Sequence, residues 1–73
     1  MIEIRLFATL RQGREKIYHE PAEKFQTGRD IIEYYQISQN DVSIFLINGI
    51  HSKLEDAVKA EDVIAIFPPV GGG

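Results

Sequence analysis

Seventy-three residues suffice for one small domain, close to the lower size limit for a self-sufficient hydrophobic core. The formal net charge of −3 disfavours nucleic acid as a partner, and the 44% hydrophobic fraction disfavours intrinsic disorder. Without cysteine the chain has no disulfides, thiolate metal sites or thiol nucleophiles. No apolar run is long enough to cross a bilayer and no signal-peptide pattern is visible, so we expect a cytoplasmic protein without a membrane partner.

Residues 1–8 alternate between apolar and polar side chains, which predicts a half-buried strand. Ile2, Ile4 and Leu6 fall on its core face. Phe7 falls on the opposite face, among charged residues. It is therefore either an aromatic at the rim of a small core or a binding residue.

A second strand is expected over residues 16–20, antiparallel to the first. Ile17 is its clearest core candidate. His19 shares the parity of Ile17 and is interpreted as a packed or edge histidine, because no second ligand near it indicates a metal site. Pro21 ends the strand.

Thr27 and Asp30 have the spacing of a helix N-cap and its acidic partner three residues on. An apolar stripe follows, and it predicts a helix over about residues 28–37 with Ile37 packed near its end. Gly28 in the first turn weakens this helix, because glycine has low helix propensity.

Three strands are expected after the helix. Residues 42–47 are almost entirely apolar, as in an interior strand covered on both faces. The pair Asn48-Gly49 is a strong turn signal, with a short strand over 50–53 behind it. After an inward-packed turn, the last strand covers 63–67, with Ile64 and Ile66 toward the core.

These elements predict an α+β roll, in which one helix crosses one face of a mixed sheet. We expect the first and last strands to lie parallel and adjacent at its centre. Phe7 and Phe67 then project from the face without a helix and form a candidate docking patch, which His51 could border.

The chain ends in the run Pro68-Pro69-Val70-Gly71-Gly72-Gly73. The prolines cannot continue a sheet ladder, and they direct the chain away from the fold. The glycines form a thread narrow enough for a slot that any Cβ would block. The α-carboxylate of Gly73 is the only reactive group there, and ATP-dependent adenylation could activate it. The alternatives are a frayed terminus or a cloning remnant.

No catalytic triad, phosphate-binding loop or His/Cys ligand cluster is visible. The acidic residues Glu55, Asp56, Glu61 and Asp62 are interpreted as solvated turn charges. Arg5, Arg11 and Arg14 are either solvated or positioned for an acidic partner, and the sequence leaves both open.

Three segments stand out in the sequence, namely residues 6–11, residues 47–49 and the run from Asp62 to the terminal glycines. Together they resemble the small subunit of molybdopterin synthase, the MoaD group of the ThiS/MoaD sulfur carriers. The opening Leu6-Phe7-Ala8-Thr9-Leu10-Arg11 is similar to its LFA-x-LR motif. Ile47-Asn48-Gly49 is similar to its VNG turn, and Asp62 through Val70 with the terminal glycines is similar to its FPPV-x-GG ending. Glu61 stands where the family has glycine, and Gly28 stands where a larger apolar residue is usual.

The resemblance implies a ubiquitin-like β-grasp domain over residues 1–69 and a flexible tail over 70–73. It implies that an E1-like, MoeB-like enzyme uses ATP to adenylate Gly73, which becomes a thiocarboxylate. The chain itself would bind no cofactor or metal and would be no enzyme alone. Its sulfur would form the molybdopterin dithiolene within a heterotetramer with the MoaE-like large subunit.

We assign residues to this activity by position. Tail insertion into a partner is assigned to Val70, Gly71 and Gly72. Partner binding is assigned to Phe7, Arg11, His51, Phe67, Pro68 and Pro69. Two alternatives remain open. Three terminal glycines also occur in the ThiS carriers of thiamine thiazole synthesis, and a ubiquitin-like modifier would conjugate Gly73 to lysines.

Overall fold

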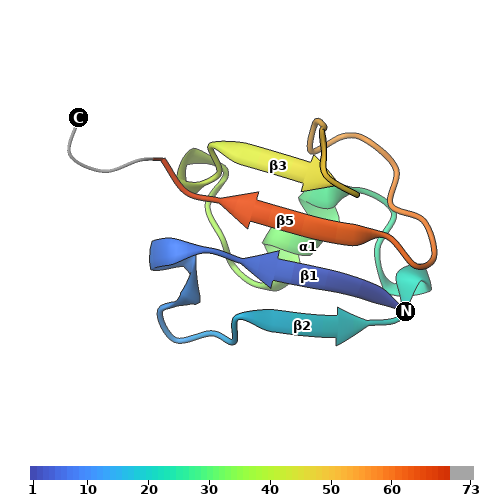
Figure 1. The fold of residues 1–73 in the computed structure, drawn as a ribbon, viewed down its shortest axis with the longest axis horizontal. Coiled ribbons are helices and arrows are strands. Elements are labelled where there is room, and N and C mark those ends of the chain that lie inside the picture. Colours follow the sequence, from blue (N-terminus) through green and yellow to red (C-terminus); the bar gives the residue numbers. More distant parts are fainter. Residues whose placement is uncertain (70–73) are drawn as a thin grey trace.

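The computed structural model describes residues 1–69, in which five strands form one mixed sheet with a single α-helix on one side (Figure 1). The strands are β1 (Ile2–Leu6), β2 (Ile17–Glu20), β3 (Ile44–Ile47), β4 (Ile50–His51) and β5 (Val63–Phe67), and the helix is α1 (Gly28–Tyr34). Short 3₁₀ turns cover Ala8–Arg11, Ala22–Lys24 and Gln39–Asp41. The tail predicted over 70–73 lies outside the described residues.

The sheet has the strand order β2-β1-β5-β3-β4. β1 and β5 are parallel neighbours at its centre, and every other pair is antiparallel. Figure 1 shows α1 behind the sheet and β2 along one edge. The predicted α+β roll with parallel central strands is therefore confirmed.

The core lies between the two central strands and α1. Its fully buried side chains are Ile2, Ile4, Leu6, Ile31, Ile32, Ile64 and Ile66. The strand members of this set are those that alternation in the sequence assigned to the core face. Burial of isoleucine and leucine side chains stabilises the fold by about 1.5–3 kcal/mol each.

The helix begins as predicted and ends earlier. The Asp30 carboxylate accepts the Thr27 backbone N–H at 3.2 Å, as part of a capping box. The helix stops at Tyr34 instead of residue 37, because Gln36 adopts a left-handed φ of 57°. Arg14, from the loop before β2, donates to the carbonyl groups of Tyr35 and Gln36 at this end.

Gly28 has a packing role that helix propensity alone does not predict. An added Cβ would lie 2.3 Å from the Phe45 Cζ atom, well inside van der Waals contact. The absence of a side chain allows the first turn of α1 to pack directly on the Phe45 ring of β3. The close packing of helix and sheet therefore depends on this glycine.

Ile17 was wrongly predicted as a core residue. The register pairs Tyr18 with Ile4, which turns Tyr18 toward the helix and leaves Ile17 opposite Arg5 with 45% of its surface exposed. The Tyr18 ring packs on that of Tyr35 at 4.4 Å between centroids. The larger aromatic surface thus takes the inward position, and His19 is exposed on the edge strand with Ile17.

The two strands that follow the helix are shorter than predicted. β3 begins at Ile44 rather than residue 42, and β4 covers two residues rather than residues 50–53. The predicted turn at Asn48-Gly49 is confirmed, with φ values of 53° and 80°. Positive φ at both positions is typical of a type I′ hairpin.

Asp62 was wrongly interpreted as a solvated charge, since it is only 9% exposed. Its carboxylate accepts the Lys59 backbone N–H at 2.8 Å and the Asn48 side-chain amide at 2.9 Å. The Asn48 carbonyl oxygen in turn accepts the Val63 N–H. This network joins the β3–β4 turn to the start of β5, whereas Glu61 is exposed as expected.

Candidate functional site

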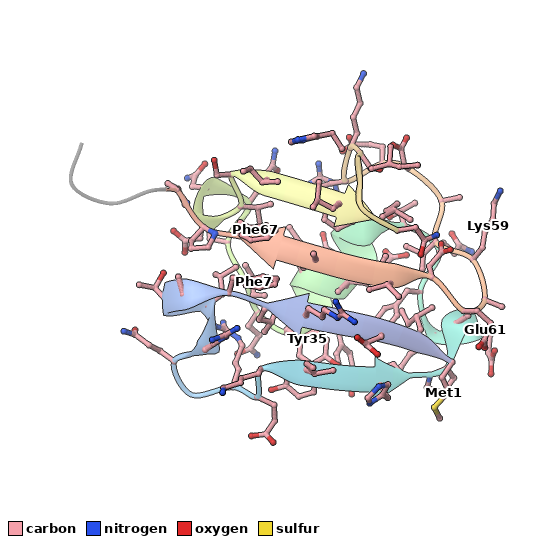
Figure 2. All side chains as sticks on the ribbon, viewed as in Figure 1. Met1, Phe7, Tyr35, Lys59, Glu61 and Phe67 are labelled. Carbon is pink, nitrogen blue, oxygen red and sulfur yellow. The ribbon has the colours of Figure 1, made fainter. Side chains whose placement is uncertain are left out.

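Phe7 and Phe67 stack on the sheet face that α1 does not cover. Their ring centroids lie 4.2 Å apart and their planes differ by 8°. Figure 2 shows the two side by side at the end of the sheet where the described chain stops. Both are half-buried, so one side of the pair remains open to a partner. The predicted sharing of one face is confirmed.

Arg11 extends this pair. Its guanidinium carbon lies 5.3 Å from the Phe7 ring centroid, in cation–π geometry. Its Nε donates to the Leu6 carbonyl oxygen at 2.7 Å, which fixes the side chain beside the ring. We call Phe7, Arg11 and Phe67 the aromatic patch. It combines flat apolar rings with one positive charge.

Arg5 and Arg14, the other two arginines of the cluster near the start of the sequence, bond to groups within the domain. Arg5 forms an ion pair with Glu3 on the same strand. Arg14 donates to carbonyl groups at the end of α1. The three arginines that cluster in the sequence therefore have different partners in the fold, and of these three Arg11 is the one that lies over the Phe7 ring.

His51 lies on the uncovered face but away from the aromatic patch. The register places it opposite Leu46, and Leu46 opposite Ala65 of β5. β3 therefore separates His51 from the strand that carries Phe67. The structure does not bring His51 against the aromatic rings.

The prolines mark where the chain leaves the sheet. The Ser43 N–H donates to the Phe67 carbonyl oxygen at 2.8 Å, and Pro68 follows at once. Pro68 is half-buried and Pro69 is exposed. The positions predicted for insertion and chemistry, Val70, Gly71, Gly72 and Gly73, lie outside the described residues. The aromatic patch thus lies directly beside the exit of the tail.

Sequence reasoning missed two apolar residues of this face. Ile44 pairs with Phe67 and Leu46 pairs with Ala65, so both project from the uncovered side of β3. The run at 42–47 indicated burial on both faces, whereas the structure leaves this face without a second layer. Their alternation with the buried Phe45 was the available signal.

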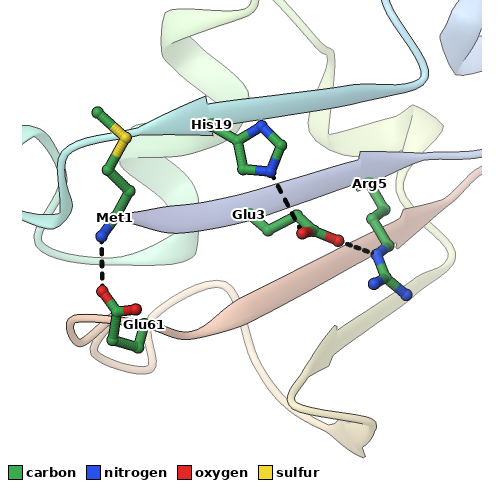
Figure 3. A network of polar contacts seen from close by, with 5 residues as sticks. All are labelled: Met1, Glu3, Arg5, His19 and Glu61. Atoms are coloured by element: carbon green, nitrogen blue, oxygen red, sulfur yellow. Dashed lines mark hydrogen bonds and ion pairs between the residues drawn. The ribbon is translucent and has the colours of Figure 1, made fainter.

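The opposite half of the face is polar, as Figure 3 shows. His19 Nε2 lies 3.3 Å from the Glu3 carboxylate, which also pairs with Arg5. The hydrogen bond from Arg5, followed by that from His19, lowers the pKa of Glu3. Nearby, the Met1 ammonium lies 2.6 Å from Glu61. The uncovered face therefore carries the stacked rings beside the end of β5 and a network of charged side chains at the opposite end.

No metal site accompanies this surface in residues 1–69, where no group of three or more histidine or acidic side chains could hold an ion. In the same part of the chain no helix has the length and apolarity needed to cross a membrane. Every buried polar side-chain atom described has a hydrogen-bond partner.

Comparison with known proteins decides the family. The model of the ThiS family matches residues 4–73, nearly the whole chain with its terminal glycines. The chain belongs to the ThiS family. No curated protein sequence matches this ThiS-family chain significantly.

Solved structures resemble the ThiS-family chain along its whole length. SAMP1 of Haloferax volcanii has a TM-score of 0.74 at 25% identity, over 99% of this chain and 98% of that one. A protein named as a candidate molybdopterin converting factor subunit 1 of Pyrococcus furiosus has a TM-score of 0.66 at 25% identity, over 94% and 97%.

A third structure, the complex of subunits 1 and 2 of the molybdopterin-converting factor of Helicobacter pylori, has a TM-score of 0.65 at 22% identity, over 99% and 97%. These likenesses confirm the ubiquitin-like β-grasp fold. The family match places the chain among the ThiS/MoaD-type sulfur carriers and ubiquitin-like modifiers.

Proposed function

We propose that this chain is the sulfur-carrying small subunit of a molybdopterin synthase. The observation that carries the proposal is the aromatic patch beside the Pro68-Pro69 exit of β5. A partner that binds this patch can receive the chain end that follows. The matched family region extends to the last glycine, which supports a role for the terminus.

The proposed chemistry belongs to the terminal carboxylate of Gly73. A carboxylate oxygen attacks the α-phosphorus of ATP on an E1-like enzyme, and pyrophosphate leaves. The terminal sulfur of a persulfide donor then attacks the acyl adenylate and displaces AMP, which gives an acyl disulfide. A second thiol cleaves its S–S bond, so that the chain keeps the sulfur as a thiocarboxylate and the donor leaves as a disulfide with that thiol. The three glycines present no side chains that would obstruct access to this carboxylate.

The proposed partner is a large synthase subunit that accepts the thiocarboxylate and forms the dithiolene. Support comes from two neighbours named for the molybdopterin-converting factor, one of them determined with its second subunit. The Phe7–Phe67 stack and Ile44 provide an apolar contact area for this subunit, and Arg11 provides a charge for orientation. His51, Pro68 and Pro69 remain proposed contacts at the margin.

A ubiquitin-like modifier is the second candidate, favoured by the likeness to the small archaeal modifier protein 1. A thiamine-pathway carrier is the third, because the matching model is that of the ThiS family. Both share activation at Gly73 with the first proposal. They differ from it in the final acceptor of the activated terminus.

Intact-mass spectrometry of protein isolated from its own cells tests the proposal. A carrier gains about 16 Da when sulfur replaces one oxygen, whereas a modifier is recovered in conjugates of higher mass. Reconstitution with a large synthase subunit then separates the molybdopterin from the thiamine branch. Conjugates without a +16 Da species would contradict the carrier.

Deletion of Gly72 and Gly73 provides the matched test of the terminus. We expect an unchanged melting temperature, because the last residues of a chain generally contribute few buried contacts, and complete loss of sulfur transfer. A variant with one alanine added after Gly73 is the control, because it keeps all three glycines but moves the terminal carboxylate to another residue. It should also abolish transfer. Retained transfer by the deletion variant would refute a role for the terminal carboxylate.

A further inference from the structure

The outer edge of β2 carries backbone groups without partners in residues 1–69. The Leu6 N–H donates to the Lys16 carbonyl oxygen at 2.9 Å, while the N–H groups of Glu3 and Phe7 donate toward β5. Strand hydrogen bonds alternate in direction, so the backbone groups of Ile17 and His19 point away from β1. Figure 1 shows β2 at the margin of the sheet, with no described element beside it.

This free edge has defined ends. Pro21 has no N–H and closes one side. At the other end, the Glu15 N–H donates to the Tyr18 hydroxyl at 3.0 Å and is satisfied. The free edge is therefore a short stretch over residues 17–19, none of them Lys, Arg, Asp or Glu. Charged side chains and prolines are the usual protection of edge strands, and here they flank the stretch without covering it.

We propose that two copies of this chain associate antiparallel through the outer edges of β2. The register that pairs all of the free backbone groups places Ile17 and His19 of one copy opposite His19 and Ile17 of the second copy. Each copy then donates and accepts with the backbone groups left free in the single chain. The two-fold axis passes beside Tyr18, so the contact is closed and leads to a dimer rather than a fibre.

Side chains agree with this register. Ile17 is 45% exposed, and in the dimer it packs beside the His19 ring of the second copy. Lys16, which has no ion pair in the described chain, lies opposite Glu20 of the second copy. Glu20 already accepts from Lys24 at 2.9 Å, so Lys16 adds a second cation to that carboxylate. Opposite charges face each other across the pair, and this stabilises a sheet contact.

The aromatic patch remains free in this dimer. The axis is perpendicular to the sheet, so both uncovered faces lie on the same side of a continuous ten-stranded sheet, twice the five strands of one copy. The β5 strands of the two copies run in opposite directions. The proposal therefore does not depend on the proposed function, and docking of a synthase subunit or an activating enzyme does not compete with it.

Sedimentation velocity over a concentration series tests association, and amide hydrogen exchange locates it. We expect a shift from the 8.3 kDa chain toward twice that mass as concentration rises. The N–H groups of Ile17 and His19 should gain protection over the same range. Loss of association in the Phe67→Ala variant, with Ile17 and His19 still exchanging rapidly, would instead assign the contact to the uncovered face and overturn the proposal.

Lys16→Glu provides the specific variant, because it sets like charges opposite each other in the proposed register. We expect the concentration for half-dimerisation to rise by about tenfold or more. Lys53→Glu is the matched control, since it gives the same net charge, −3 − 2 = −5, on another exposed lysine. Equal effects of the two variants, or a monomer at every concentration, would overturn the proposal. The proposal would also be overturned if the N–H groups of Ile17 and His19 gained protection from exchange only when a peptide from another protein is added.

Discussion

At the scale of single residues, neighbours in β5 have opposite roles. Phe67 is half-buried in the aromatic patch, whereas Ile66 is fully buried beneath the sheet. The two side chains are adjacent in sequence and project to opposite faces. They therefore form a matched pair for separating binding from stability.

We expect Phe67→Ala to weaken binding of the synthase large subunit by more than about 2 kcal/mol, roughly thirtyfold, with a nearly unchanged melting temperature. Ile66→Ala should lower the free energy of unfolding by about 2–5 kcal/mol, because it creates a cavity in the core. Titration calorimetry and thermal melts on both variants check this. A folded Phe67→Ala variant of normal affinity would contradict the docking role.

Gly28 gives a second prediction at this scale. Alanine is the better helix former by about 1 kcal/mol, so propensity alone predicts that Gly28→Ala stabilises α1. Its Cβ would overlap the Phe45 ring, with 2.3 Å to the nearest atom. We therefore expect a net destabilisation of about 1–3 kcal/mol in urea unfolding.

The double variant Gly28→Ala/Phe45→Leu tests whether contact with the Phe45 ring causes this destabilisation. Leucine removes the ring atoms that the new methyl group would meet. The penalty of Gly28→Ala should therefore be smaller in the Phe45→Leu background than alone. Equal penalties in the two backgrounds would show that ring contact is not the reason for this glycine.

At the scale of elements, the β3–β4 turn is joined to β5 by side chains as well as by the backbone, where the Asn48 N–H donates to the Val63 carbonyl oxygen at 2.7 Å. Asp62 and Asn48 bond each other and cap the backbone at Lys59 and Val63. Glu61, just before Asp62, adopts a left-handed φ of 68°. Glycine adopts positive φ without strain, which explains the glycine at this position in the MoaD sequences that the chain resembles.

We expect Asp62→Ala to destabilise the protein by about 1–3 kcal/mol, because it leaves polar groups of Asn48 and Lys59 without a partner. Amide exchange should accelerate first in β4 and the Asn48-Gly49 turn. Asp56→Ala is the control, since Asp56 also accepts a backbone N–H, that of Lys53, but is exposed. Equal losses of stability in both variants would contradict a special role for Asp62.

How far the sequence predicted the structure depends on the range of the interactions. Alternation in β1 and β5 and the Thr27/Asp30 spacing are local signals, and the elements they predict are present. Which side of β2 faces the core could not be predicted from alternation, because Ile17 and Tyr18 are adjacent and both can be buried. The register with β1 decides it. Burial of Asp62 depends on Asn48, which is distant along the chain. The aromatic patch was found by parity, but Arg11's contact with Phe7 needed three-dimensional geometry.

At the scale of the whole molecule, one acidic residue links β2, the 3₁₀ turn after it and the C-cap of α1. Glu20 accepts from the Tyr35 hydroxyl at 2.6 Å and from Lys24 at 2.9 Å. The Tyr35 hydrogen bond, followed by that of Lys24, lowers the pKa of Glu20 below its ordinary value of 4.5. A lowered pKa in the folded state means that ionised Glu20 stabilises the fold.

This contribution to stability should be complete above pH 4.5, the ordinary pKa, and should be lost as the pH falls through the lowered pKa of the folded state. Glu20→Gln removes the titrating group. We therefore expect the free energy of unfolding of Glu20→Gln to fall less steeply than that of the parent between neutral pH and pH 3 to 4, in urea titrations. Parallel curves would show that Glu20 is not linked to folding.

The central position of β5 also has a mechanical consequence. The strand that leads to the proposed reactive end is bonded to β1 on one side and β3 on the other. A pull on the tail acts along β5 and loads both ladders in shear, so their hydrogen bonds resist together instead of opening one after another. An enzyme that draws the tail into a narrow channel can therefore apply force without peeling the strand from the domain.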